Sequence, residues 1–386
     1  MSAASAKSSR DVLLRIHRDA QEYLRNQFAI SWGPRYLASR GFTEVITQTW
    51  AIGYAPGNGT ALFNHLCAKG HTVEQLQDAG LVVITRTGRP IDRFRDRITA
   101  PVLDEDGHIV AFIGRASPAA PPSTPKYLNS PNSDLYRKHE ILFGLAQAES
   151  RLAVGAQPVL VEGLWDAIAV STDYRFAGLA PCGTALTAHH VDALARRAPV
   201  RDLGVIAAFD SDPAGHRAML SAYEKLTSVT DHTYAVRLPP GRDPADLLQI
   251  GGPDYVANAL DGLSHLADFV VDAVLDQAAT APDGYRPLDH AEGRLHALRA
   301  STAVLIGKPA ADVHRQIRRI AERLGETVPT VMAAYVDNPR REIDLASTGL
   351  PTSRQALLRS FDRTAATDDR RALSARPRSP DLAPSR

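Results

Sequence analysis

Strand-like and helix-like segments alternate between residues 157 and 239, and this alternation constrains the fold more than any other feature of the sequence. The apolar runs PVLVEG, FAGLAP, GVIAAFD and TYAVRLP have the character of buried strands, and the first three are each followed by a helix-like segment. Alternating elements of these lengths predict a parallel, doubly wound α/β sheet. In such sheets, functional groups gather at the carboxyl ends of the strands.

Acidic side chains follow these strands. Glu162 comes after the first strand and Asp166 lies one helical turn later, while the third strand leads into Asp210 and Asp212. A further acid, Asp243, follows the last strand in the motif GRDPAD. Several carboxylates close together repel one another, and a divalent cation relieves that repulsion. Hard oxygen ligands suit Mg²⁺ or Mn²⁺, so the sequence predicts a divalent metal site for phosphoryl transfer.

Each of these acids also has a structural interpretation. Asp210 and Asp212 are typical turn residues at a strand end. Glu162 suits the amino end of a helix dipole, and Asp166 is a common kind of first-turn helix residue. In the last motif, Asp246 is expected only to begin a helix. Considered jointly and with their strand contexts, the acids favour a functional role.

The preceding segment, residues 11–152, is expected to form an α+β subdomain. Helical spacing and end signals predict helices over 11–28, 33–40, 60–68 and 72–78. The runs LVVIT, ITAPVLD and HIVAFIGR predict strands, and the turn DEDG between the last two indicates a hairpin. Residues 1–10 are expected to be disordered, because they are rich in Ser and Ala.

After Leu263 the pattern is helical throughout. The expected domain bounds are 153–263 for the α/β domain, 264–337 for a helical subdomain and 338–386 for a mostly disordered tail. Helices are predicted over 266–277, 288–306, 310–324 and 329–335.

Composition excludes several classes of protein. The formal net charge is +1, so affinity for nucleic acid would require a local basic surface. Cys67 and Cys182 are the only cysteines, which suits a reducing compartment and provides neither a disulfide framework nor a cysteine-rich zinc site. The first residues lack a secretory signal, and no apolar run is long enough to span a membrane. A cytoplasmic protein without a membrane partner is therefore expected.

The motifs EGLWD, GTALT, FDSDPAG and GRDPADLL, in this order, resemble the TOPRIM domain of bacterial replicative primases of the DnaG type. Upstream, YLASRGFTEVITQTWAIGYAP, DRFRDRITAPVLDEDGHIVAFIGRA and PKYLNSPNSDLYRKHEILFG resemble the catalytic core of that family, so the resemblance covers about residues 11–260. An ordered series of motifs is far more specific than a single DxD. The resemblance implies a Rossmann-like TOPRIM domain, preceded by an α+β primase-core subdomain and followed by a helical subdomain.

The resemblance also implies a reaction, which is template-directed synthesis of RNA primers on single-stranded DNA from ribonucleoside triphosphates. It assigns catalysis to Glu162, Asp210 and Asp212, and metal binding to these three together with Asp166 and Asp243. Glu162 is also a candidate for proton transfer, and the sequence leaves this choice open.

Polar and basic residues of the motifs are expected to hold the polyanionic template and the triphosphate. These residues are Arg93, Arg115, Lys126, Tyr127, Asn129 and Lys138. The alternative is a solvated charged face with local partners such as Asp92 and Asp96. That alternative is favoured for Arg86 and Arg89.

Gly183 and Thr184 open a predicted helix after a strand. The helix amino terminus there could hold a phosphate. A tight turn with a helix cap explains the same two residues equally well. His189 and His190, on the predicted helix, lack metal-ligand spacing and are expected at the surface.

The sequence departs from the family in the zinc-binding domain, in EGLWD and in DPAD, where Asp246 is displaced by one position relative to members with DPD. The zinc-binding domain of the usual primase has no counterpart, because its ligands are missing, so no zinc is expected. Start-site selection would then come from another chain, be relaxed or be absent. The family's EGYMD is EGLWD, in which Leu164 and Trp165 change the packing beside the acids.

Competing functions remain for this sequence. One is another TOPRIM enzyme, such as a metal-dependent nuclease, although a nuclease would not need the PKYLNS segment. Another is a catalytically inactive primase homologue that binds nucleic acid. For the leading primase function, the expected partners include a replicative helicase or a separate zinc-domain protein. The helical segment is then either the end of the catalytic core or a helicase-contact domain.

Overall fold

The computed structural model describes residues 8–209, 213–280 and 285–339. The chain divides into two compact units between Val270 and Val271. Asp210 and Asp212, two of the predicted metal ligands, lie outside the described residues. No helix in the described part of the chain is long and apolar enough to cross a membrane.

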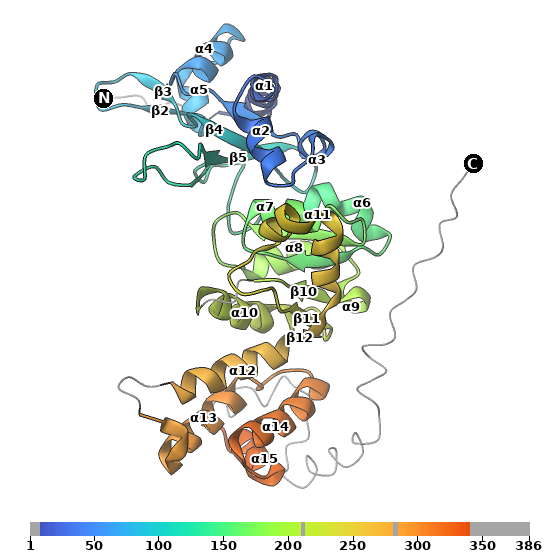
Figure 1. The fold of residues 1–386 in the computed structure, drawn as a ribbon. Helices are drawn as coiled ribbons and strands as arrows, with labels where there is room; N and C mark the ends of the chain where they lie inside the picture. The colour runs from blue at the N-terminus through green and yellow to red at the C-terminus, as the bar shows by residue number, and fades with distance from the viewer. Residues whose placement is uncertain (1–7, 210–212, 281–284, 340–386) are drawn as a thin grey trace, which may run out of the picture. The chain divides into compact units, whose positions relative to one another are not determined.

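The first unit begins with an α+β subdomain (Figure 1). Its main sheet has the antiparallel order β1-β4-β5-β6, formed by β1 (Gly53–Ala55), β4 (Arg97–Leu103), β5 (Ile109–Ala116) and β6 (Tyr127–Asn129). A separate hairpin pairs β2 (Val82–Ile84) with β3 (Pro90–Asp92). The helices are α1 (Arg10–Phe28), α2 (Gly33–Ser39), α3 (Glu44–Thr49), α4 (Ala61–Ala68) and α5 (Val73–Asp78).

Helix α1 shows how the sequence builds this subdomain. Its residues Leu13, Ile16, Ala20 and Leu24 recur at helical spacing, are almost completely buried, and form one face against β1 and β5. The predicted helices 11–28, 33–40, 60–68 and 72–78 are all present, and α3 was not predicted. Disorder was wrongly expected just before α1, because Ser8 donates hydrogen bonds to Asp78 from both its backbone and its hydroxyl group.

One buried histidine lies in this core. The His17 ring stacks on Phe112 at 5.9 Å, and its Nδ1 lies 2.8 Å from the carbonyl oxygen of Leu13. Its Nε2 is buried and finds no hydrogen-bond partner among the described residues. Burial lowers the pKa of His17 to about 4, because the charged ring cannot be solvated there.

We expect this histidine to make the fold acid-sensitive. The unfolded chain binds a proton near pH 6.5, whereas the folded chain resists protonation until about pH 4. The free energy of unfolding is therefore unaffected by this group above pH 6.5. It decreases as the pH falls from 6.5 toward 4, by about 3 kcal/mol in total, because only the unfolded chain takes up the proton in that range. Urea unfolding of wild type and His17→Leu at several pH values measures it. Equal pH dependence of the two proteins between pH 6.5 and 4 would contradict the assignment.

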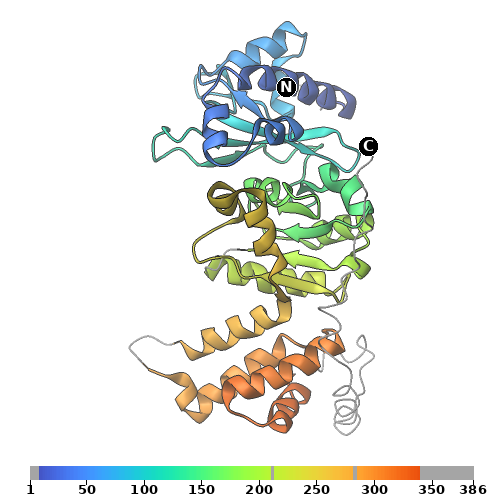
Figure 2. The ribbon, with the colours of Figure 1, turned by 45° about the vertical axis from the view of Figure 1, so that its right-hand side comes forward.

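The α/β part of the first unit contains a sheet in which six described strands have the order β12-β11-β10-β8-β9-β7 (Figures 1 and 2). The strands are β7 (Leu142–Phe143), β8 (Gln157–Leu160), β9 (Phe176–Pro181), β10 (Val205–Ala207), β11 (Thr233–Val236) and β12 (Leu263–His265). The surrounding helices are α6 (Leu145–Ala153), α7 (Leu164–Val170), α8 (Ala188–Arg197), α9 (Val200–Leu203), α10 (Pro213–Leu226) and α11 (Pro244–Asp261).

The predicted parallel sheet is confirmed for its four central strands, since β11, β10, β8 and β9 run parallel to one another. The edge strands differ from the prediction, because β7 and β12 each pair antiparallel with a neighbour. The expectation of an entirely helical chain after Leu263 was therefore wrong for Ser264 and His265, which pair with β11 before α12 begins.

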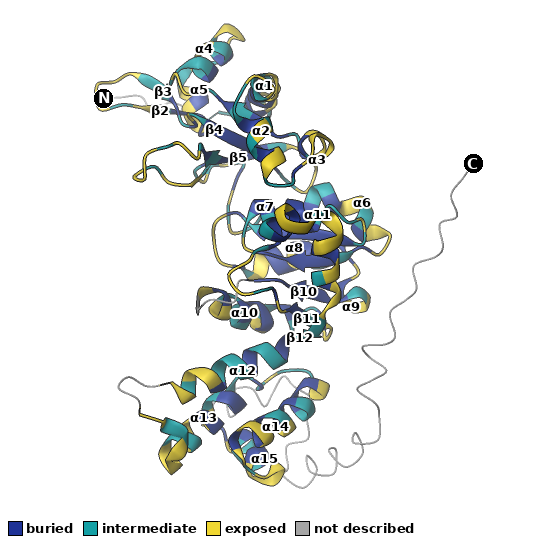
Figure 3. Ribbon diagram, in the orientation of Figure 1, coloured by how far each residue is buried: buried dark blue, intermediate teal, exposed yellow. Residues whose placement is uncertain are grey.

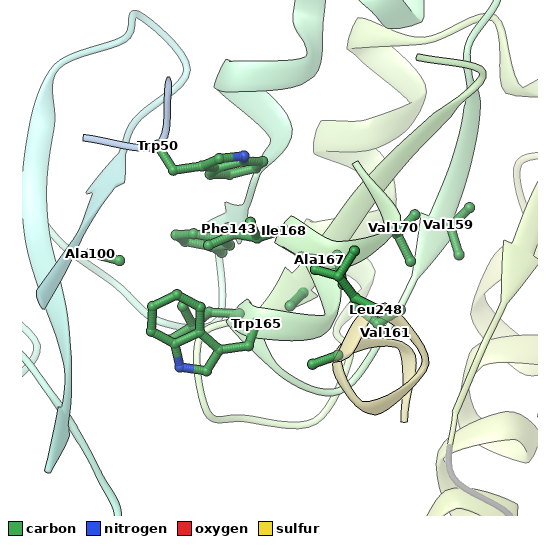
Figure 4. Packing of buried hydrophobic residues seen from close by; sticks show 14 of the residues in the cluster. Trp50, Ala100, Phe143, Val159, Val161, Trp165, Ala167, Ile168, Val170 and Leu248 are labelled. Carbon is green, nitrogen blue, oxygen red and sulfur yellow. The ribbon is translucent and has the colours of Figure 1, made fainter. Parts of the chain in front are cut away.

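The hydrophobic core runs without a break from the α/β sheet into the amino-terminal subdomain. The four parallel strands are mostly buried (Figure 3), and Trp50 stacks on Phe143 at 5.3 Å between the two parts (Figure 4). Phe42 contacts Trp165 in the same core, with ring centroids 5.2 Å apart. This shared core fixes the basic residues of the subdomain relative to the acids of the sheet.

The second unit is helical. Its elements are the end of α12 (Leu266–Ala279), the 3₁₀ helix η2 (Pro287–Asp289), α13 (Ala291–Ala303), α14 (Ala310–Leu324) and α15 (Val328–Val336). An apolar face of α14, including Val313, Ile317 and Ile320, is buried in its core. Arg319 grips Asp272 with two hydrogen bonds of 2.9 and 2.5 Å, which ties α14 to α12. The predicted helices are confirmed.

Candidate active site

Two groups of predicted site residues come together in the first unit. The first group surrounds a cavity where the α+β subdomain meets the α/β sheet. The cavity is lined by Tyr36, Leu37, Arg40, Phe42, Arg115, Lys126, Tyr127, Trp165, Asp166, Asp243 and Ala245. Two predicted metal ligands thus share one cavity with three of the predicted phosphate-binding residues.

The two acids of the cavity are held by helix termini. Asp166 lies in the first turn of α7, and its Oδ1 accepts a hydrogen bond of 3.2 Å from the backbone of Ala245. Asp243 caps α11, and its Oδ1 accepts a hydrogen bond of 2.7 Å from the backbone of Asp246. An ionised carboxylate has about four lone-pair sites, so one capping bond is compatible with metal ligation.

Glu162 is exposed and lies two residues beyond the end of β8. The next strand in the sheet is β10, where Ala207 pairs with Leu160 and Ala208 donates to the carbonyl oxygen of Leu160 at 2.8 Å. The carboxyl ends of these two strands are therefore neighbours, as the prediction requires.

Among the described residues, three potential ligand atoms of His, Cys or acids come close together elsewhere, in the turn between β4 and β5. These residues are Asp104, Asp106 and His108. The turn itself explains the cluster, because Asp104 accepts backbone hydrogen bonds from Asp106 and His108 and pairs with Arg10 at 2.8 Å. It was not predicted and we assign it no metal.

Cations and aromatic rings alternate on the cavity wall. The guanidinium of Arg115 lies 4.2 Å from the ring centroid of Tyr36, and the ammonium of Lys126 lies 5.5 Å from that of Tyr127. Desolvation, together with the charges of Asp166 and Asp243, raises the pKa of Tyr127 to about 12, while Arg115 acts in the opposite direction. The Tyr127 hydroxyl therefore stays protonated at neutral pH.

The second group surrounds the end of β9. Arg93 donates two hydrogen bonds, of 2.9 and 3.3 Å, to the carbonyl oxygen of Asn129. The Asn129 amide donates in turn to the carbonyl oxygen of Cys182 at 2.9 Å. Burial raises the pKa of the Cys182 thiol to about 11. The segment that contains Lys138 leads into β7, whose Leu142 pairs with Pro181 at the end of β9. Gly183 follows Cys182 directly.

The structure corrects two expectations at this point. Gly183 and Thr184 do not open the helix, because α8 begins at Ala188 and is capped by Thr187. They lie instead in an exposed loop, where Thr184 donates to the carbonyl oxygen of Ala185 at 3.1 Å. His190 is not a surface residue but is fully buried, and its ring forms part of the helix cap.

The acids suggested as local partners of the arginines are engaged with other groups. Asp92 accepts hydrogen bonds from the backbone of Leu62 and Phe63, at the start of α4. Asp96 accepts from the indole of Trp32 and the hydroxyl of Tyr54, each at 2.7 Å. Arg86 and Arg89 are exposed, as the interpretation of a solvated face requires.

The sequence missed several residues of the cavity wall. Tyr36, Arg40 and Phe42 all lie within the segment YLASRGF, whose resemblance to the family was the available signal. Arg40 pairs with Asp246 at 3.0 Å, which joins α11 to the amino-terminal subdomain. Trp165, which replaces the usual family residue, is buried against Phe42.

Gly183→Ala is expected to destabilise the protein through two effects. Gly183 has a φ of +74°, and a Cβ atom there would lie 2.4 Å from the Asn129 amide nitrogen. The left-handed conformation costs about 1–2 kcal/mol for alanine, and loss of the Asn129 bond adds about 1 kcal/mol. Calorimetric melting of the variant measures the sum.

Gly88→Ala is the matched control, because Gly88 has a φ of +76° with nothing within 4 Å of the added carbon. It should show the conformational cost alone. If both variants lose the same stability, the approach of the added Cβ atom at position 183 to Asn129 contributes nothing to the loss.

Comparisons with known proteins agree with this architecture. Residues 21–149 match the family described as the DNA primase catalytic core, N-terminal domain, and residues 159–248 match the Toprim-like family. The DNA primase of Deinococcus radiodurans is 36% identical over 259 residues, which are 66% of this chain and 44% of that protein. The Streptomyces coelicolor DNA primase is 33% identical over 321 residues, 81% and 48% of the two chains. The chain thus spans less than half the length of these relatives.

Solved structures match over a larger share of their length. The RNA polymerase domain of Mycobacterium tuberculosis primase DnaG, crystallised with double-stranded DNA, is 29% identical with a TM-score of 0.68, and the match covers 83% of this chain and 99% of that one. A DnaG primase catalytic domain bound to single-stranded DNA is 26% identical with a TM-score of 0.66, covering 82% and 97%.

A Toprim sheet with acids at the carboxyl ends of its strands, joined to a primase-core subdomain, defines a primase-type catalytic core. The chain belongs to the family of DnaG-type DNA primases and covers the catalytic core of that family. Because the first unit ends at Val270, a match over 83% of the 386 residues extends into the second unit. At least part of the helical segment is therefore similar to the corresponding part of that RNA polymerase domain.

Proposed function

We propose that the chain synthesises short RNA primers on single-stranded DNA from ribonucleoside triphosphates. The observation that carries this proposal is the shared cavity, in which Asp166 and Asp243 face Arg115, Lys126 and Tyr127. A primase needs acids for metal ions and cations for phosphates within reach of one substrate. The curated relatives are DNA primases, which supports the same activity.

The metal site would be built from carboxylates on separate strands and helices. Its ligands would be Glu162, Asp166, Asp210, Asp212 and Asp243. Carboxylate oxygens suit Mg²⁺ or Mn²⁺, whereas structural zinc sites favour sulfur and nitrogen ligands. When bound, such ions neutralise phosphate charge and stabilise the attacking and leaving oxygens of the displacement.

The remaining residues would bind and orient the substrates. Arg115 and Lys126 would hold the triphosphate, and the neutral Tyr127 hydroxyl would donate a hydrogen bond to it. Arg93, Asn129 and Lys138, with the loop of Gly183 and Thr184, would bind phosphates of the nucleotide or the template. The alternative role for the exposed Glu162, in place of metal binding, would be to accept the proton of the primer 3′-hydroxyl.

The proposed activity also implies partners. A replicative helicase or a separate zinc-domain protein would supply the choice of start site. The place of action would be the bacterial cytoplasm, in accord with two free cysteines.

An incubation with single-stranded DNA, labelled ribonucleotides and Mg²⁺ or Mn²⁺ tests the proposal. We expect new short oligonucleotides that depend on the metal and on the template. Degradation of the DNA would instead identify a nuclease. No turnover, even with a helicase and a zinc-domain protein added, would identify an inactive homologue that binds nucleic acid.

A further inference from the structure

His190 connects the start of α8 to the loop that carries Lys138. The backbone N–H of Thr187 donates to Nδ1 of His190 at 3.2 Å, and Nε2 of the same ring lies 2.9 Å from the carbonyl oxygen of Lys138. Both ring nitrogens therefore have backbone partners, although these partners come from different parts of the chain.

These contacts fix the tautomer of His190. An N–H group faces Nδ1, so Nδ1 must be the acceptor and carry no proton. The proton then lies on Nε2, which donates to the Lys138 carbonyl. Burial lowers the pKa of His190, in keeping with a neutral ring.

The loop is held at three consecutive points. The Lys138 N–H donates to the Asn132 side chain at 3.3 Å, the Lys138 carbonyl accepts from His190, and the His139 carbonyl accepts from the Thr187 hydroxyl at 2.6 Å. The Thr187 hydroxyl also accepts from the His190 backbone at 3.2 Å. The capping box of α8 thus fixes two successive carbonyls of a distant loop.

A histidine at position 190 suits these two contacts, because its ring must accept from the Thr187 backbone and donate to the Lys138 carbonyl. An ordinary capping box uses Glu or Gln at this position, whose oxygen accepts from the capping residue. Glutamate has no donor for a second carbonyl, whereas histidine offers an acceptor and a donor on opposite sides of one rigid ring.

We propose that His190 is a positioning residue, which holds the backbone of Lys138 beside the carboxyl end of β9, where β7 pairs with that strand, so that the Lys138 side chain binds phosphate there. The inference rests on the proposed function, since it gives Lys138 a role in binding triphosphate. Within the described residues, the hydrogen bonds of the His190 ring go to backbone atoms of Thr187 and Lys138 and to no acid.

Calorimetric titration with GTP and Mg²⁺ tests this inference independently of primer synthesis. We expect His190→Ala to weaken GTP binding about tenfold, the size of effect known for residues that orient a ligand-binding group. His190→Gln should restore the affinity to within about twofold, because its amide offers both an acceptor and a donor. His189→Ala, which removes the neighbouring exposed histidine, should leave binding unchanged.

The decisive comparison repeats His190→Ala in a Lys138→Ala background. If His190 acts through Lys138, the second substitution adds no further loss of GTP affinity, although both His190→Ala proteins melt earlier than their parents. An equal loss in both backgrounds would overturn the inference, as would unchanged GTP affinity in Lys138→Ala. GTP binding with the expected pattern but without any primer synthesis would refute the proposed function and leave the role of His190 standing.

Discussion

Replacing Asp210 and Asp212 together by asparagine is expected to lower the rate of primer synthesis by about 1000-fold. The two acids follow β10, the neighbour of the strand that leads into Glu162. Asparagine keeps the size of aspartate but removes the charge that attracts a divalent cation. The assay is incorporation of labelled ribonucleotides on single-stranded DNA. The same variant should bind the DNA with affinity within about twofold of wild type, because phosphate contacts to cations carry that binding.

Asp106→Asn is the matched control. It removes an exposed acid from the Asp104, Asp106 and His108 cluster, where three potential ligand atoms come close together. Primer synthesis should continue at the wild-type rate in this variant. Retained synthesis in the Asp210 and Asp212 variant, or an equal loss in Asp106→Asn, would show that the acids after β10 are not the metal ligands of the reaction.

Gly178→Ala is expected to have the largest effect on stability, a loss of more than about 3 kcal/mol. Gly178 lies in β9, and its backbone N–H donates to the Ser171 side chain. A Cβ atom at this position would lie 2.1 Å from the carbonyl oxygen of Ala167 and 2.7 Å from two other backbone atoms of that residue. Because these atoms are backbone, α7 must move away from the sheet. A fall in melting temperature of about 10 °C should accompany this change.

The same movement should impair the active site, since α7 carries Asp166 in its first turn. Gly57→Ala is the control, because its added carbon would meet only the Asp96 Cβ at an ordinary 3.4 Å. If the melting temperature of Gly178→Ala equals those of Gly57→Ala and wild type, then β9 and α7 are not packed as described.

The elements that could be predicted are those whose signals are local. Helix α1 follows from the spacing of its apolar residues, and β8 to β11 follow from short apolar runs. Strand β12 could not be predicted, because a three-residue strand shows no periodicity and depends on pairing with β11. The start of α8 was misplaced because Gly183 resembled a helix opening, whereas Thr187 forms the cap.

In the candidate site, too, contacts between residues far apart in the sequence could not be predicted. The sequence motifs indicated Asp166 and Asp243, but not that Asp166 accepts a hydrogen bond from Ala245, a residue 79 positions away. The contribution of Tyr36 to the cavity likewise depends on its long-range contact with Arg115. For His190, a sequence pattern with histidine in place of Glu or Gln gave no capping signal, and its bond to Lys138 spans 52 positions.

Diffraction from crystals soaked in Mn²⁺, with the anomalous signal used to locate the ion, tests the central claim most directly. Acids on separate strands should hold a divalent ion together, so a Mn²⁺ peak is expected in direct contact with Glu162 and the Asp210–Asp212 pair. A peak only at the turn of Asp104, Asp106 and His108, or a Glu162 carboxylate remote from that aspartate pair, would contradict it.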